Sequence, residues 1–197
     1  MQLLLSLSQV SAAGKAWRTA ALDVFNDARF FRSSPAAGSQ WRPLVSRLME
    51  LDRDRLQEFL GECTIMSTQS TDDLGRIGAT PSANIFTNRE AEMIARSTNL
   101  RRLSFILYSS DRDHYVTQLP GIQEKLVDIL RTTIVSPMVH SEVRTAKGSG
   151  MRLTIQVYLC LRVLLCRLSP QYLANFWPVI LAELVRCEDG FVNDTDV

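Results

Sequence analysis

Histidines, cysteines and acidic pairs are the residues of this sequence that could do chemistry, and their spacing matches no catalytic or metal-binding motif. His140 with Ser141 could in principle pair a general base with a nucleophile. A surface or hydrogen-bonded histidine is the commoner role at such a position. The acidic pairs at 52/54 and 72/73 could ligate a cation, but they fit a solvated helix end and a polar loop better. Glycine-rich cofactor motifs are also absent, so the sequence predicts neither an enzyme nor a catalytic, metal or cofactor site.

The four cysteines indicate a reducing compartment. They stand at positions 63, 160, 166 and 187, form no CxxC pair and have no histidine at metal-ligand spacing. Cys160 and Cys166 lie inside an apolar run, where a free thiol behaves as a small hydrophobic residue. The first residues lack the basic region that opens a secretory signal. We therefore expect reduced thiols and a cytosolic protein.

Charge is almost balanced, with 22 basic and 21 acidic residues and a formal net charge of +1. A large nucleic-acid surface needs a marked basic excess, so nucleic acid is not an expected partner. Three arginines could form a local partner or phospholipid surface: Arg96, Arg101 and Arg102. A solvated helix face is the simpler interpretation of that cluster. The apolar run 153–168 contains Gln156 and two arginines, which favours a buried helix over a membrane span.

Apolar residues that recur every three and four positions predict helices through most of the chain. The pattern covers 13–28 and 41–60, the latter as two short helices. Residues 66–86 have no such period and are rich in Ser, Thr, Asp, Gly and Pro, which predicts a flexible loop. Thr87 and Glu90 then form a capping box, which predicts that the next helix begins at Thr87 and ends near 109.

The last predicted helix has the clearest pattern. Ser169 is expected to be its N-cap, and Pro170 suits its first position. Apolar residues then fall at helical spacing and predict a buried stripe: Leu173, Phe176, Trp177, Ile180, Leu181 and Leu184. Pro178 lies inside this stretch and should bend the helix or break its first turns.

These elements predict an all-α fold. Successive antiparallel helices joined by short turns suggest a stacked α-solenoid segment of the armadillo or HEAT kind, with a compact helical bundle as the alternative. The predicted organisation has four parts: N-terminal helical hairpins at 1–65, the loop at 66–86, a C-terminal helical core at 87–185 with an insert at 143–156, and a polar tail at 186–197.

A long collinear stretch resembles the C-terminal region of the Dopey family. It includes NREAE at 88–92, NLRRLSFILYSSDRDHY at 99–115, LPGIQEKLVDILR at 119–131 and VYLCLRVLLCRLSPQYLANFWPVILAEL at 157–184. The segment at 7–31 is similar to the preceding part of the family. The resemblance covers most of residues 3–185 and depends on this order of segments, not on one short motif.

The resemblance implies a non-catalytic, leucine-rich scaffold segment of a large peripheral membrane protein. Dopey proteins act in endosome-to-Golgi vesicle transport and Golgi organisation. The resemblance implies a cytosolic protein at Golgi and endosome membranes. The implied partners are a large Golgi scaffold related to guanine-exchange factors and a flippase complex. It carries over no catalytic residues. The alternative is a stand-alone helical lipid-binding or lipid-transfer module, for which an enclosed apolar cavity would be the sign.

Two segments depart from the family pattern, 143–156 and 186–197, and both open near a Val-Arg pair. Codons for Val-Arg can read as an intron donor, and Gln156 can close on an acceptor. One hypothesis is that both segments are translated introns, and that Met1 is an internal start. The alternative is a genuine insert and tail. For the insert, the glycines at 148 and 150 predict a solvent-exposed excursion from the helix, because each costs about 1 kcal/mol in a helix interior.

Overall fold

The computed structural model describes residues 6, 14–27, 29–52, 54–62, 82–134 and 144–192, and this part of the chain is helical without a strand. The all-α prediction is therefore confirmed. No helix in the described ranges is both long enough and apolar enough to span a bilayer. The elements are α2 Gly14–Asn26, η2 Phe30–Arg32, α3 Pro35–Leu51, α4 Arg55–Glu62, α5 Ser82–Ser109, η4 Val116–Gln118, α6 Leu119–Ile134, α7 Arg144–Arg167, α8 Pro170–Leu173 and α9 Trp177–Val192.

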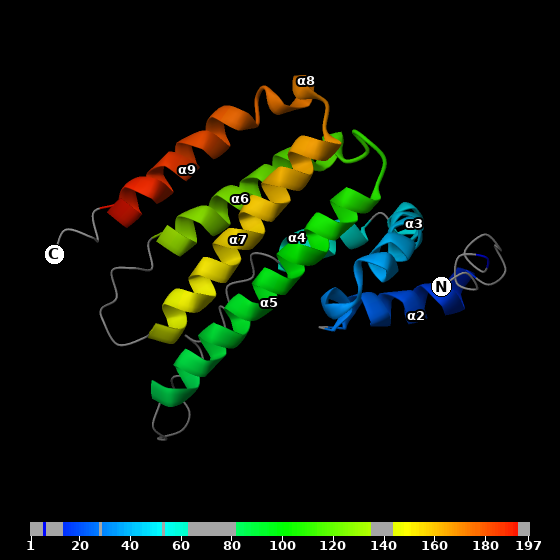
Figure 1. The fold of residues 1–197 in the computed structure, drawn as a ribbon, viewed down its shortest axis with the longest axis horizontal. Coiled ribbons are helices and arrows are strands. Elements are labelled where there is room, and N and C mark those ends of the chain that lie inside the picture. The colour runs from blue at the N-terminus through cyan, green and yellow to red at the C-terminus, as the bar shows by residue number, and fades with distance from the viewer. Residues whose placement is uncertain are drawn as a thin grey trace.

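Four helices form two stacked hairpins. Figure 1 shows α5 and α7 running in one direction and α6 and α9 in the other, with the turns of both hairpins at the same end. Helix α7 packs against α5, helix α9 packs against α6, and α6 and α7 also touch. Like-directed helices thus lie side by side in two layers. This is the arrangement of stacked repeats in an α-solenoid, in agreement with the architecture expected from the sequence.

An aromatic cluster joins the N-terminal helices to α5. Phe30 meets Phe25 edge-on with ring centroids 5.0 Å apart, and it meets Trp41 at 5.3 Å and Phe105 at 5.4 Å. Phe25 also meets Phe59 of α4 at 5.8 Å. Edge-to-face rings add about 0.5–1.5 kcal/mol per pair beyond the area they bury. The cluster therefore fixes α2, α3 and α4 on one side of α5.

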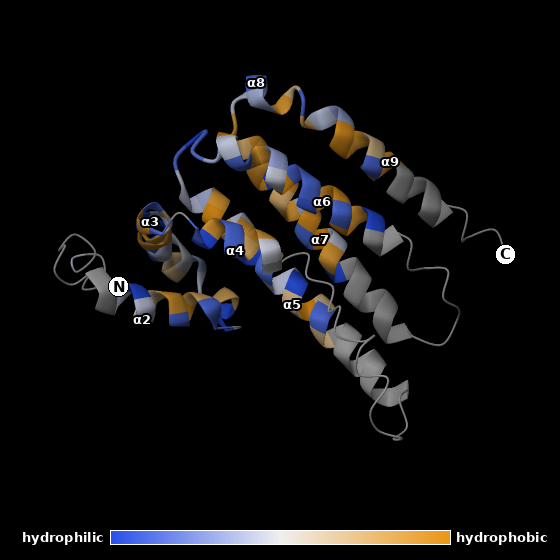
Figure 2. Ribbon diagram, turned by 180° about the vertical axis from the view of Figure 1, so that it is seen from behind, coloured by the Kyte–Doolittle hydropathy of each residue, from blue (hydrophilic) through white to orange (hydrophobic). Residues whose placement is uncertain are grey.

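Sequence chemistry explains where α3 and α9 begin. The Ser34 hydroxyl oxygen accepts a hydrogen bond from the Ala37 amide at 3.3 Å, and Pro35 fills the first helical position. At the C-terminal end, the predicted single helix is divided: α8 ends at Leu173, and α9 starts at Trp177 with Pro178 in its first turn. The predicted break near Pro178 is confirmed. Hydrophobic and hydrophilic residues alternate along the coloured parts of the helices (Figure 2).

One helix boundary predicted from the sequence is wrong. Helix α5 begins at Ser82, so the capping pair Thr87 and Glu90 lies inside the helix and not at its start. No proline or glycine separates Ser82 from Thr87, and extending a helix costs little once a turn has formed. Residues 82–86 therefore belong to the helix and not to the predicted loop, whose other residues fall outside the described ranges.

The predicted excursion near Gly148 is also wrong, because residues 144–156 continue the same helix as 157–167. Leu153 from this segment is only 1% exposed and lies in the core. Burial of Leu153 and unbroken backbone hydrogen bonding outweigh the propensity cost of the glycines. Residues 144–156 are therefore an integral part of α7.

Candidate functional site: the outer face of α7

Helix α7 is apolar on two sides, and only one of them is buried. Residues of the buried side recur at helical spacing and are at most 4% exposed: Leu153, Val157, Cys160, Leu161 and Leu164. The opposite side carries Ile155, Tyr158, Leu159 and Leu165, which are 38–52% exposed. A helix that is hydrophobic all round normally has neighbours all round. We call the exposed set, with Arg162 and Cys166 between its members, the α7 outer face.

Charge on α7 is of one sign. Its 24 residues contain five basic side chains and no aspartate or glutamate. Arg152 and Arg162 are both exposed, and Arg162 lies seven residues after Ile155 and three before Leu165, in the middle of the outer face. The surface therefore combines aliphatic, aromatic and guanidinium groups. Protein interfaces are enriched in Tyr and Arg and depleted in Lys, and the outer face follows that composition.

The apolar run 153–168 was predicted to be a buried helix, and this is correct for one side only. Sequence reasoning missed the outer face. The available signal was that hydrophobic residues occur on every side of the helix, more than two neighbouring helices can cover. The identity of the uncovered side depends on where α5 and α6 lie, which local sequence does not specify.

Helix α9 also exposes apolar residues. The predicted core stripe is partly right: Leu173, Phe176 and Ile180 are buried, and Trp177 and Leu184 are half-buried against the core. Leu181 is 47% exposed, which contradicts its place in the stripe. Because α6 covers α9 from one side, only a narrow stripe is buried. The flanks, including Val185 at 56% exposure, stay in solvent.

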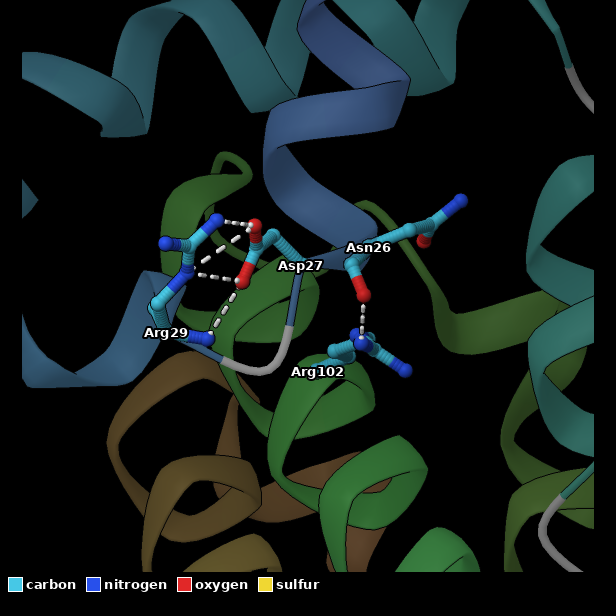
Figure 3. A network of polar contacts seen from close by, with 4 residues as sticks. All are labelled: Asn26, Asp27, Arg29 and Arg102. Atoms are coloured by element: carbon cyan, nitrogen blue, oxygen red, sulfur yellow. Dashed lines mark hydrogen bonds and ion pairs between the residues drawn. The ribbon is translucent and has the colours of Figure 1, made fainter.

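The three arginines predicted as a surface do not form one. Arg102 is buried, and its Nε donates to the Phe25 carbonyl oxygen at 3.3 Å while Nη2 donates to the carbonyl oxygen of Asn26 (Figure 3). Nη1 donates to Asn99 Oδ1 at 2.5 Å. These carbonyls end α2, where helix hydrogen bonding leaves acceptors without partners. Arg102 is therefore a C-terminal cap for α2 supplied by α5.

Arg96 and Arg101 also have structural contacts. Arg96 is only 8% exposed and forms an ion pair with Glu92, with Nη2 and Oε1 2.5 Å apart. Arg101 is exposed, and its guanidinium lies 4.6 Å from the ring centroid of Phe31. A buried charge is costly unless it is paired, and the ion pair with Glu92 makes the burial of Arg96 tolerable. Only Arg101 remains accessible to a phosphate or a partner.

The short turn after α2 holds its own ion pair (Figure 3). Arg29 donates to both carboxylate oxygens of Asp27, with Nη2 and Oδ2 2.8 Å apart. The hydrogen bonds from Arg29 lower the pKa of Asp27 to about 2. The pair is well exposed to solvent, so it orders the turn and adds little to stability.

The predicted cap at Ser169 has a different partner from the one expected. Ser169 stands at the N-cap of α8 before Pro170, as predicted, but its hydroxyl makes no capping bond to the helix. The hydroxyl donates to Asp113 Oδ2 at 2.5 Å, and the Ser169 amide donates to Asp113 Oδ1 at 2.6 Å. Asp113 belongs to the turn of the other hairpin and was not singled out from the sequence.

Titratable groups in the described region show structural roles. Burial raises the pKa of the Cys160 thiol to about 12, against a weaker opposite effect of its hydrogen bond to Ser104, so this cysteine is a protonated core residue. Cys160 and Cys166 are free thiols, while Cys63 and the side chain of Cys187 lie outside the description. His140 and Ser141 lie outside it as well. No group of three metal-ligating side chains comes together within the described ranges.

A hollow of about 590 Å³ lies between the end of α2, helix α4 and the middle of α5. Its lining mixes charged and amide side chains with apolar ones: Asn26, Arg55, Glu58, Phe59, Ala91, Ile94, Ala95, Thr98, Asn99 and Arg102. Arg55 pairs with Glu58 across 2.5 Å. Polar groups in such number are unlike the apolar, enclosed lining that holds a lipid tail.

The fold and this site define a class: a stacked helical-hairpin protein whose most distinctive surface is an uncovered apolar helix face. The family model described as DOP1 C-terminal matches residues 1–196. The chain therefore belongs to the DOP1 C-terminal family, and the resemblance to Dopey proteins is confirmed.

Individual relatives agree. The chain is 35% identical over 184 residues to Protein DOP1 homolog of Drosophila pseudoobscura pseudoobscura, which covers 93% of this chain and 6% of the relative. It is 34% identical to Protein pad-1 of Caenorhabditis elegans and 29% identical to Protein dop1 of Emericella nidulans, covering 6% and 9% of those proteins. The chain thus spans less than a tenth of the length of these relatives. No solved structure matches it.

Proposed function

We propose that this chain is a non-catalytic scaffold segment of a Dopey-like protein in endosome-to-Golgi vesicle transport and Golgi organisation, and that the α7 outer face is where it holds a partner. The exposed apolar side of α7 carries the proposal. A solvated helix would have polar residues there, and exposed apolar patches of this kind mark interaction sites.

The cellular part of the proposal follows from family membership. A Dopey-like role would place the full-length protein in the cytosol, peripherally bound at Golgi and endosome membranes. The partners proposed on that basis are a large Golgi scaffold related to guanine-exchange factors and a flippase complex. A helical segment that stacks in two layers offers extended surfaces suited to assembling such partners.

A helical lipid-binding or lipid-transfer module is the second candidate, and the presence of a hollow between α2, α4 and α5 is the feature that favours it. The lining of that hollow is mixed and polar, whereas a lipid chain needs an apolar enclosure, and this difference favours the scaffold. Extraction of purified chain with organic solvent, followed by lipid mass spectrometry, distinguishes the two. Stoichiometric co-purifying lipid would support the module and contradict the scaffold.

The scaffold proposal is tested in the full-length protein with Leu159→Glu, which places a charge on the α7 outer face. Val24→Glu is the matched control, because Val24 is 47% exposed on α2, far along the chain from the outer face. We expect Leu159→Glu to remove the protein from Golgi and endosome membranes and to slow cargo return, while Val24→Glu does neither. Normal localisation and transport with Leu159→Glu, at unchanged protein level, would contradict the proposal.

A further inference from the structure

We propose that the α7 outer face binds an amphipathic helix of a partner protein, and that this helix carries a carboxylate in the middle of its apolar stripe, opposite Arg162. The inference deepens the proposed function and rests on it. It specifies the chemistry of the partner from the residues of the outer face.

The hairpin formed by α7 and α9 does not have the surface of a terminal repeat. End repeats of stacked helical proteins present a polar outer side, because that side meets water. Here Ile155 and Leu159 on α7 are exposed, as are Leu181 and Val185 on α9. A further helix packed on α7 would cover its outer face in the way that α5 covers its inner face.

Arg162 determines what the covering helix must contain. The residues of the outer face recur at intervals of three and four, so the apolar side chains lie before and after Arg162 along one side of the helix. Covering these residues removes water from the guanidinium, which is costly unless an acceptor replaces the water. Helix α7 has no acidic residue to supply that acceptor. The partner must bring the carboxylate.

Two other occupants fit less well. A second copy that paired through the same face would bring Arg152 and Arg162 of both chains together without an acidic counterpart. A membrane would have to accept Arg162 in the middle of the apolar side, where a cation is most costly to bury. The composition of the outer face, with Tyr158 and Arg162 but no lysine, is typical of protein interfaces and agrees with a protein partner.

The test uses a displayed library of amphipathic helical peptides about 20 residues long. The apolar stripe is fixed except at its central position, and that position and all positions outside the stripe are randomised. Selections run against the whole 197-residue chain and against Arg162→Glu. Selected peptides are mapped with a photo-crosslinking residue in place of Leu159. We expect the unmodified chain to select Asp or Glu at the stripe centre, and Arg162→Glu to select Lys or Arg there.

Affinities provide the quantitative readout. A peptide selected on the unmodified chain should bind Arg162→Gln about 30-fold more weakly, because truncating one member of a desolvated charge pair has at least this effect. Arg32→Glu is the control, since Arg32 is an exposed arginine in η2, outside the α7 outer face. This variant should bind the same peptide as tightly as the unmodified chain does.

Other outcomes would overturn the inference. Peptides that crosslink to α7 without a central carboxylate, and bind Arg162→Glu equally well, would leave α7 as a docking face but refute the carboxylate. Absence of crosslinked peptides would count against the docking face itself. Binding to phosphatidylserine vesicles that is lost in Arg162→Glu would assign the outer face to a membrane, and a dimer dissolved by Leu159→Glu would assign it to a second copy.

Discussion

Asp113 and Ser169 join the turns of the two stacked hairpins. Both carboxylate oxygens of Asp113 accept from Ser169, one from the amide and one from the hydroxyl. The Asp113 amide donates in return to the Arg167 carbonyl oxygen at 3.0 Å. Asp113 adopts φ of 61°, a left-handed conformation that few residue types other than glycine tolerate. Its side chain and its backbone thus both serve the contact between turns.

This contact predicts a stability that depends on pH. Hydrogen bonds from Ser169 lower the pKa of Asp113 below its ordinary value of 3.8. A lowered pKa in the folded state means that the stabilisation is complete above pH 3.8 and disappears as the pH falls through the folded-state value. We expect Asp113→Asn to be less stable than the unmodified chain at pH 6, with the difference shrinking towards pH 3. Urea unfolding across that range measures it; a difference independent of pH would contradict the role of the carboxylate.

Two neighbouring residues of α9 should differ widely in their contribution to the free energy of unfolding. Ile180 is fully buried, so Ile180→Ala should lower the free energy of unfolding by about 2–5 kcal/mol. Leu181 is 47% exposed, and Leu181→Ala should stay within about 0.5 kcal/mol. Chemical denaturation of the two variants gives both numbers. Equal losses would show that the two side chains share one environment.

Adjacent arginines of α5 form a second matched pair. Arg102→Ala removes the hydrogen bonds to two α2 carbonyls and to Asn99, and should cost at least about 2 kcal/mol, because a single hydrogen bond from a charged donor is already worth about 1.5–3 kcal/mol. Arg101→Ala removes only the stacking on Phe31 and should cost less than about 1 kcal/mol. Thermal unfolding compares them. Similar stability of both variants would mean that Arg102 does not hold α2.

The layer of α6 and α9 contains a buried carboxylate. Glu183 is 2% exposed, and its Oε1 accepts from Arg131 Nε at 2.9 Å and from Nη2 at 2.6 Å. Arg131→Ala leaves a buried charge behind, so it should destabilise more than Arg131→Ala combined with Glu183→Gln. A double variant less stable than the single one would contradict this account.

Deletion of residues 143–156 should destabilise the chain, although their polar, glycine-containing composition suggests that they could be removed without loss. A polar, glycine-containing insert looped out of the helix could be deleted without loss of stability. Because 144–156 are helical and Leu153 is buried, deletion should cost more than about 2 kcal/mol, and Leu153→Ala alone about 2–5 kcal/mol. Unfolding of both variants tests this. A deletion variant as stable as the parent chain would favour the translated-intron hypothesis, which messenger RNA spliced across the interval would test directly.

The sequence by itself determined the helical class, the family and part of the core. Periodicity of three and four residues located α2, α3 and α4, Ser169 with Pro170 located the start of α8, and Pro178 correctly predicted the break before α9. These features are local: spacing, capping and proline chemistry act within one or two turns. The starts of α5 at residue 82 and of α7 at residue 144 were not predictable in this way. How far a helix extends depends on its packing against other helices as well as on its capping residues.

The tertiary structure decided which side of each helix is covered. Arg96, Arg101 and Arg102 form one basic cluster in the sequence, yet only Arg101 is exposed, since α2 closes over Arg102. Helix α7 is apolar on two sides, and only the positions of α5 and α6 distinguish its inner face from its outer one. Asp113 and Ser169 meet 56 residues apart because two hairpins stack with their turns together. Burial and pairing of this kind depend on neighbours that are distant in the chain, and local sequence does not encode their positions.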